Sequence, residues 1–171
     1  MRNTTSQLDL DKIRYGRGRV PRFQFFFRKA QEANNKIAKL FYKTLFVYFR
    51  NKNHIEMSAD MEIAEGLYIG HSFCITFNPG VKIGKNVNIH KGVTIGRENR
   101  GERKGCPVIG DEVWIGINST IVGAIHIGND VLIAPNTFVN RDIPDHSIVF
   151  GNPCIIKHRE NATEGYINNK V

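Results

Sequence analysis

The stretch that decides the fold is residues 109–139, IGDEVWIGINSTIVGAIHIGNDVLIAPNTFV, in which a large aliphatic side chain returns at every sixth position. The recurring residues are Ile109, Ile115, Ile121, Ile127, Ile133 and Val139. An α-helix turns by about 600° over six residues, about 120° from its starting direction, so it cannot keep this period on one face. A single long strand would alternate instead. The period is typical of a parallel β-helix, in which three hexads form a coil of about eighteen residues.

The same period extends upstream, with two interruptions. Its members there are Met57, Ile63, Ile69, Phe77, Ile83, Ile89 and Ile95. Two extra residues stand between Ile69 and Phe77, and eight between Ile95 and Ile109. Insertions into a solenoid loop out of its wall, and such loops often carry function. We predict a mainly β fold, with a parallel β-helix over residues 55–145, a loop insertion at 97–107 and a C-terminal extension over 146–171.

The positive charge of the chain is concentrated at its N-terminus. Residues 1–54 hold 13 Lys or Arg and 3 Asp or Glu, a charge of +10, whereas the remainder carries −2 of the total of +8. Polar residues around Gly16 and Gly18 predict a flexible lead over 1–22, and apolar residues at three- and four-residue steps predict a basic amphipathic helical arm of one or two helices over 23–54. This arm is expected to pack on the protein or on a second subunit, with contact to an anionic membrane surface or a lipid-linked substrate as the alternative. Nucleic acid is not expected as a partner, because no nucleic-acid-binding motif accompanies the charge.

The overall composition narrows the class of protein. Hydrophobic residues make up 41% and charged residues 23% of the 171 residues, as in soluble globular proteins. No apolar run reaches membrane-spanning length and no signal-peptide core is present, so we expect a cytoplasmic protein, with the inner face of the membrane as a variant of that location. The three cysteines, Cys74, Cys106 and Cys154, are widely spaced, and we expect neither a disulfide framework nor a metal site.

Several motifs within residues 54–158 resemble those of a known family. They are the hexads of residues 57–139, the GHSFCI segment at 70–75, GVTIG at 92–96, the long loop ending at Pro107, and IVFGNP at 148–153. Together they resemble the hexapeptide-repeat acyltransferases, most closely the serine acetyltransferase branch. The resemblance implies a left-handed β-helix, a homotrimer with active sites between neighbouring subunits, and acetyl-CoA as the acyl donor.

Acetyl transfer to a hydroxyl needs a base for the hydroxyl proton, and histidine is suited to this near neutral pH. His71, in the shorter insertion, falls where the family places its catalytic histidine. Fifteen residues earlier the family has an aspartate that orients this histidine, and here that position is Glu56; the alternative is a plain surface glutamate. His90, before the GVTIG segment, is the second candidate for the base and a candidate substrate-binding residue, although an exposed residue without a role is the simpler interpretation.

Coenzyme A binding is implied by position. The family binds the pantetheine arm largely through backbone groups, which by position implies Gly96, Ile117 and Pro135. Lys157 follows the Gly-Asn-Pro segment and is a candidate for the phosphates, with an ordinary solvated tail as the alternative.

The acceptor site departs from serine acetyltransferases. The family has an aspartate directly before the catalytic histidine and an arginine and a histidine before the loop proline; this chain has Gly70 there, and Gly105 and Cys106. Arg103 and Lys104 are the nearest cations. Because serine carries an ammonium and a carboxylate, these departures favour an acceptor without amino-acid charges. We expect transfer to a sugar hydroxyl of a surface or capsular polysaccharide precursor. The alternatives are serine O-acetylation for cysteine biosynthesis, acetylation of an antibiotic hydroxyl, and a non-enzymatic scaffold.

Overall fold

The computed structural model describes residues 5–171 and contains three helices followed by fifteen short strands. Residues 1–4, part of the predicted flexible lead, lie outside the described residues. The helices are α1 (Gln7–Arg14), α2 (Arg22–Glu32) and α3 (Lys36–Lys52). The strands are β1 (Ile55–Glu56), β2 (Glu62–Ile63), β3 (Tyr68–Gly70), β4 (Ile75–Phe77), β5 (Lys82–Ile83), β6 (Asn88–His90), β7 (Thr94–Gly96), β8 (Val108–Ile109), β9 (Val113–Ile115), β10 (Thr120–Val122), β11 (His126–Ile127), β12 (Val131–Ile133), β13 (Phe138–Val139), β14 (Ser147–Phe150) and β15 (Ile155–His158).

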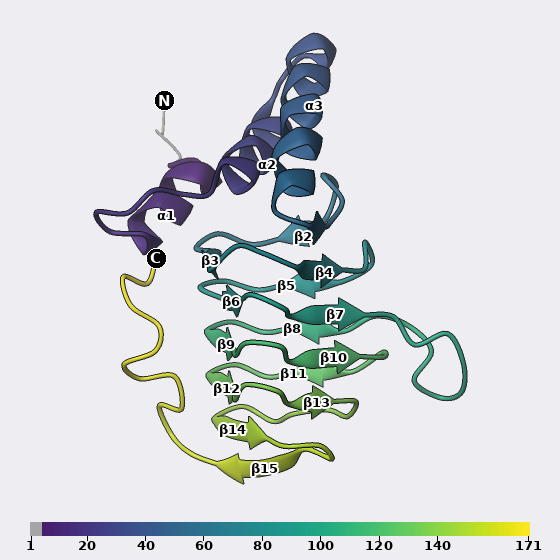
Figure 1. Cartoon of the computed structure of the whole chain (residues 1–171). Coiled ribbons are helices and arrows are strands. Elements are labelled where there is room, and N and C mark those ends of the chain that lie inside the picture. The colour runs from purple at the N-terminus through teal and green to yellow at the C-terminus, as the bar shows by residue number, and fades with distance from the viewer. Residues whose placement is uncertain (1–4) are drawn as a thin grey trace.

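The strands form a left-handed parallel β-helix with a triangular cross-section, which confirms the predicted fold (Figure 1). From β1 to β13, every third strand joins the same sheet, and β14 then pairs with β12. Sheet A has the order β1-β4-β7-β10-β13, sheet B β11-β8-β5-β2, and sheet C β15-β14-β12-β9-β6-β3. All pairs are parallel except β14 with β15, an antiparallel hairpin that ends the stack. Residues 97–107 leave the wall between β7 and β8 as a loop whose ends pair through Glu98 and Gly105.

The six-residue period lines the interior of the coils. All thirteen predicted positions from Met57 to Val139 are at most 4% exposed. The residues four places after the downstream hexad positions, Val113, Ser119, Ile125, Val131 and Thr137, are buried as well. The two hydroxyls among them donate to the carbonyl oxygen of Ala134, at 2.9 Å from Ser119 and 2.6 Å from Thr137. Each fully buried aliphatic side chain contributes about 1.5–3 kcal/mol relative to exposure.

The predicted flexible lead is wrong for the described part of residues 1–22, because α1 lies there and packs on the protein. Ser6 caps this helix by accepting a hydrogen bond from the Asp9 amide, and Leu8 is buried. The side chain of Asp11 is fully buried and forms an ion pair of 2.8 Å with Arg28 of α2. Arg28 also donates to the carbonyl oxygens of Ile63 and Ala64 in the first coil. A buried ion pair therefore fastens both helices to the β-helix.

The predicted arm over residues 23–54 contains two helices, α2 and α3. The helical segment is interrupted at residues 33–35. Asn35 caps α3 by accepting a hydrogen bond from the Ala38 amide at 2.8 Å. Phe23 and Phe27 of α2 are fully buried, whereas Phe46 is the only fully buried residue of α3, which projects beyond the end of the β-helix (Figure 1). The exposed apolar residues of α3 are Ile37, Leu40, Phe41, Val47 and Tyr48. None of the helices in residues 5–171 has the length and apolarity needed to cross a membrane.

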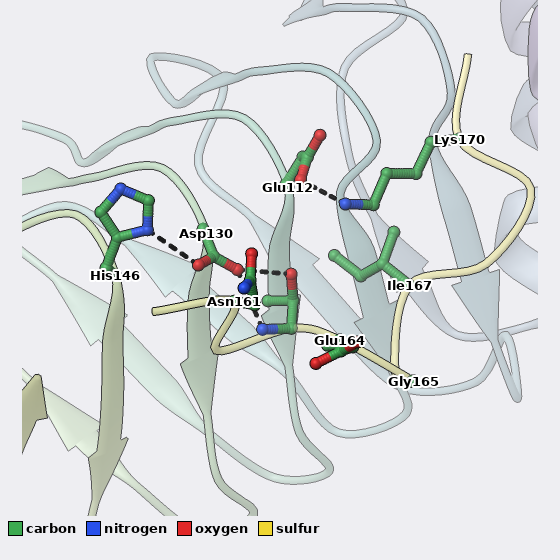
Figure 2. Close-up of a pocket in the computed structure, with 9 residues that line it drawn as sticks. Glu112, Asp130, His146, Asn161, Glu164, Gly165, Ile167 and Lys170 are labelled. Carbon is green, nitrogen blue, oxygen red and sulfur yellow. Dashed lines mark hydrogen bonds and ion pairs between the residues drawn. The ribbon is translucent and has the colours of Figure 1, made fainter. Parts of the chain in front are cut away.

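The segment after β15 runs back along the β-helix to α1 (Figure 1). Its main anchor is Asp130, which accepts hydrogen bonds from His146 Nδ1 at 2.9 Å and from the amides of Ala162 and Thr163 (Figure 2). Burial alone would raise the pKa of Asp130, but these hydrogen bonds outweigh burial and lower it. Lys170 pairs with Glu112, and the amide of Val171 donates to Asn86 at 2.9 Å. The cavity of about 420 Å³ beside Asp130 therefore belongs to the anchor of this C-terminal tail.

The buried ion pair predicts an unequal effect of two similar substitutions in α1. Asp11→Asn should lower the free energy of unfolding by about 3–5 kcal/mol, because Arg28 would remain buried without its counter-charge. Asp9→Asn is the matched control, since the Asp9–Lys12 pair is about half exposed on both sides and exposed pairs contribute little. Urea denaturation of both variants measures the difference. Equal stability of the two variants would contradict the anchoring role of Asp11.

Candidate active site

The three edges of the triangular prism divide the predicted site residues into groups. The edge from sheet C to sheet A, called the CA edge, consists of the turns at residues 71–74, 91–93, 116–119 and 134–137. The edge from sheet A to sheet B, called the AB edge, includes the turns at 78–81 and 123–125 and the loop 97–107. The C-terminal tail occupies the third edge, between sheets B and C.

His71 lies on the CA edge, in the two-residue insertion. On this edge the Asn136 amide donates to Ile117, the Asn118 amide to Lys91, and the Gly92 amide to Phe73. Phe73 therefore occupies the place of Lys91 and Ile117 in its own coil, so the two extra residues are His71 and Ser72. His71 is exposed and has a φ of +54°, in the left-handed region that several other turn residues of the coils, such as Asn118 and Asn136, also adopt.

Neighbouring elements hold the loop of His71 on both sides. The amide of Cys74 donates to the carbonyl oxygen of Asn53 at 3.0 Å, and the Gly92 amide binds Phe73 from the next coil. The rings of His54 and Phe73 meet edge to face with centroids 5.1 Å apart. The imidazole of His71 is thus presented to solvent from a fixed backbone, as a general base requires.

His90 lies beside Gly70 on the outer face of sheet C, so it is not the plainly exposed residue that the simpler interpretation expected. Its Nδ1 lies 2.9 Å from the carbonyl oxygen of Ile115, and since a carbonyl only accepts, Nδ1 carries the proton. Burial lowers the pKa of His90, the bond to Ile115 opposes this, and the nearby His71 lowers it further. His90 is therefore neutral near pH 7, with Nε2 as a free hydrogen-bond acceptor.

Gly70 is closely bordered by the ring of His90, so a side chain at this position would require that ring to move. A Cβ atom on Gly70 would lie 2.8 Å from Cδ2 and 2.9 Å from Nε2 of His90. Gly105 is similarly restricted, because its φ is +144° and a Cβ would lie 2.9 Å from that of Ala124. The next residue, Cys106, places Sγ at 3.1 Å from Oδ1 of Asn78.

Glu56 lies on the first strand of sheet A, and the structure gives it no hydrogen bond or ion pair to His71 within residues 5–171. It is exposed and lines a depression of about 490 Å³ between α3 and the first coils, together with Lys43, Arg50 and Asp60. Its role as the orienting carboxylate stays a prediction.

The predicted coenzyme A residues separate into three places. Ile117 and Pro135 lie on the CA edge with His71, whereas Gly96 ends β7 at the AB edge. Arg103 and Lys104 are exposed in the loop 97–107, also on the AB edge. Lys157 is exposed on β15, with Nζ 5.7 Å from the ring centre of Phe150. A single chain therefore does not bring all of these residues together, as expected if the CA edge of one subunit faces the AB edge of another.

A cavity beside His90 was not foreseen from the sequence. Side chains of α1, of sheet C and of the C-terminal tail line it, among them Arg14, Trp114 and Tyr166. No local sequence signal links three segments that are so far apart. Within residues 5–171, no three side chains of His, Cys, Asp or Glu gather in a way that could hold a metal ion.

Comparisons with known proteins agree with this architecture. Residues 106–141 match the family model "Bacterial transferase hexapeptide (six repeats)". Serine acetyltransferase of Helicobacter pylori is 34% identical over 97 residues, which cover 57% of each chain. That of Staphylococcus epidermidis is 34% identical over 111 residues, covering 65% of this chain and 52% of the relative. The chain thus spans about half the length of the curated relatives that it matches.

Solved structures show the same fold. Serine acetyltransferase from Brucella abortus superposes with a TM-score of 0.71 at 20% identity, covering 92% of this chain and 69% of the other. The Neisseria gonorrhoeae enzyme in complex with serine gives a TM-score of 0.66 at 24% identity, covering 88% and 67%. The predicted resemblance is confirmed: part of the chain matches a hexapeptide-repeat family model, and its β-helix is similar to that of the serine acetyltransferases.

Proposed function

We propose that the chain is an acetyl-CoA-dependent O-acetyltransferase with His71 as its general base. The observation that carries this proposal is the placement of an exposed histidine in a two-residue insertion on the CA edge, in a β-helix similar to that of serine acetyltransferases. In the reaction His71 takes the proton of the acceptor hydroxyl as its oxygen attacks the thioester carbon. The C–S bond then breaks, and the imidazolium returns the proton to the coenzyme A thiolate.

L-serine is the acceptor that the relatives favour, since those reported above are named serine acetyltransferases. This similarity supports the serine alternative better than the expected polysaccharide precursor. The role of His71 is the same for either acceptor.

A sugar hydroxyl is the second candidate, and two local features favour it. Gly70 supplies no carboxylate for the ammonium of serine, and a side chain there would contact the ring of His90. The left-handed φ of Gly105 and its contact with Ala124 oppose an arginine there for the serine carboxylate. A site without these two charges suits a neutral hydroxyl-bearing ring.

Three further parts of the proposal concern assembly and surroundings. We propose a homotrimer, because a partner subunit would bring Gly96, Arg103 and Lys104 of its AB edge toward His71 on the CA edge. We also propose a cytoplasmic location at the inner face of the membrane. Peripheral contact would be made by the exposed apolar residues of α3, which lie among Lys36, Lys39 and Arg50.

His71→Ala should lower kcat for acetyl transfer by about 10²–10⁴-fold, because a positioned general base contributes on this order. Release of free thiol from acetyl-CoA measures the rate, with L-serine and with nucleotide sugars as separate acceptors. His126→Ala, an exposed histidine on β11, is the matched control and should leave the rate unchanged. A rate within a few-fold of wild type in His71→Ala would show that another group acts as the base.

For the membrane contact, the protein should float with vesicles of phosphatidylcholine and phosphatidylglycerol at low salt and less so at about 0.15 M salt, where charges are screened. Phe41→Glu should abolish flotation because it places a carboxylate in the apolar face of α3. Ile155→Glu is the control, since Ile155 on β15 is exposed to a similar degree, 54% against 58%. Wild-type protein that does not float at low salt would leave α3 with a packing role only.

A further inference from the structure

A cavity of about 300 Å³ lies on the outer face of sheet C, where His90 forms part of its lining and borders Gly70. Its floor comes from β3, β6 and β9, one side from the end of α1, and the other from the C-terminal tail. We call it the Trp114 cavity; its lining residues are Arg14, Tyr15, Tyr68, Asn88, His90, Trp114, Tyr166, Asn168 and Asn169. Its volume is at the lower end of the range of small-molecule sites.

Five of the nine residues that line the cavity carry a ring, and polar atoms make up most of its exposed surface. The rings of His90 and Trp114 lie 4.7 Å apart, and those of Trp114 and Tyr166 meet edge to face at 5.1 Å. Asn168 and Asn169 bring exposed side-chain amides to the rim. A pyranose ring has apolar C–H faces and a hydroxyl edge, so it can stack on an aromatic ring while amides bind its hydroxyls.

The charge of the cavity argues against an amino acid. Arg14 is 4% exposed and donates from Nε to the carbonyl oxygen of Gly66 at 3.0 Å and from Nη2 to Asn88. Its Nη1 is buried and has no partner among residues 5–171, and no Asp or Glu lines the cavity. An ammonium group would therefore meet a fixed positive charge without a carboxylate to bind it.

His90 connects the cavity to the proposed base. Nδ1 is held by Ile115, so the free Nε2 accepts hydrogen bonds next to Gly70, directly before His71. A hydroxyl bound there would lie at the end of β3 from which the His71 loop departs. We propose that the Trp114 cavity binds the sugar ring of the acceptor and presents one of its hydroxyls to His71. The role of the cavity in presenting the acceptor rests on the proposed acetyl transfer, whereas sugar binding by the cavity does not depend on that proposal.

The cavity can be tested directly because Trp114 is the only tryptophan of the chain, so its fluorescence reports on the cavity alone. The probes are N-acetylglucosamine, glucuronic acid and L-serine, titrated into the full chain. We expect a saturable change in Trp114 emission with at least one sugar, none with L-serine, and the same sugar binding in His71→Ala. Unchanged emission with both sugars, or saturation by L-serine, would overturn the proposal.

A pair of tyrosine variants tests the stacking wall. Tyr166→Ala should weaken sugar binding by about five-fold or more, as expected for the loss of an aromatic contact. Tyr48→Ala is the control, since Tyr48 on α3 is outside the cavity and exposed to a similar degree, 53% against 51%. Equal affinities in the two variants would contradict the proposal. Binding of a sugar that the wild-type protein does not acetylate would overturn the role of the cavity in presenting the acceptor to His71. Absence of acetyl transfer to every acceptor tested, L-serine included, would instead refute the proposed function.

Discussion

The structure depends on the narrow triangular interior of the β-helix, which accepts a large apolar side chain at every sixth position of the regular coils. This constraint makes the period of six residues necessary, and it buries every predicted hexad position from Met57 to Val139. The coils are rigid because each backbone pairs with the coils above and below it. Residues inserted into the six-residue repeat cannot be accommodated in the wall and form loops outside it. The two insertions are therefore the positions at which a rigid wall can present catalytic side chains at the surface.

The two interruptions lie on different edges of the prism. The insertion of His71 and Ser72 is on the CA edge, and the loop 97–107 is on the AB edge. This separation explains why the predicted site is incomplete in one chain and is consistent with assembly of the site between subunits. The helices and the C-terminal tail add a second level of organisation. Both lie against the outer face of sheet C. Arg14 of α1 and Tyr166 of the C-terminal tail line a cavity beside His90 on this face.

The sequence alone predicted the wall of the β-helix and the position of His71, because both follow from counting in steps of six. It did not predict α1, since the polar residue Asp11 is typical of a solvated lead until it is seen as the buried partner of Arg28 in α2. The Trp114 cavity was also missed, because its residues are outward-facing and come from three distant segments. Glu56 shows what sequence spacing leaves open. Its position fifteen residues before His71 places it in the first coil, but the spacing does not determine which groups its side chain contacts.

The most direct test of this account is deletion of Ser72 and Phe73, which restores the eighteen-residue coil and moves His71 from the insertion into the wall position of Phe73. If the insertion lies outside the wall and its role is to hold the base, the variant should unfold at a temperature near that of the wild type and should have lost acetyl transfer. Transfer at the wild-type rate by the folded variant would contradict the account, because the register break would then have no part in positioning His71. Loss of the fold would contradict it as well, since the insertion would belong to the wall.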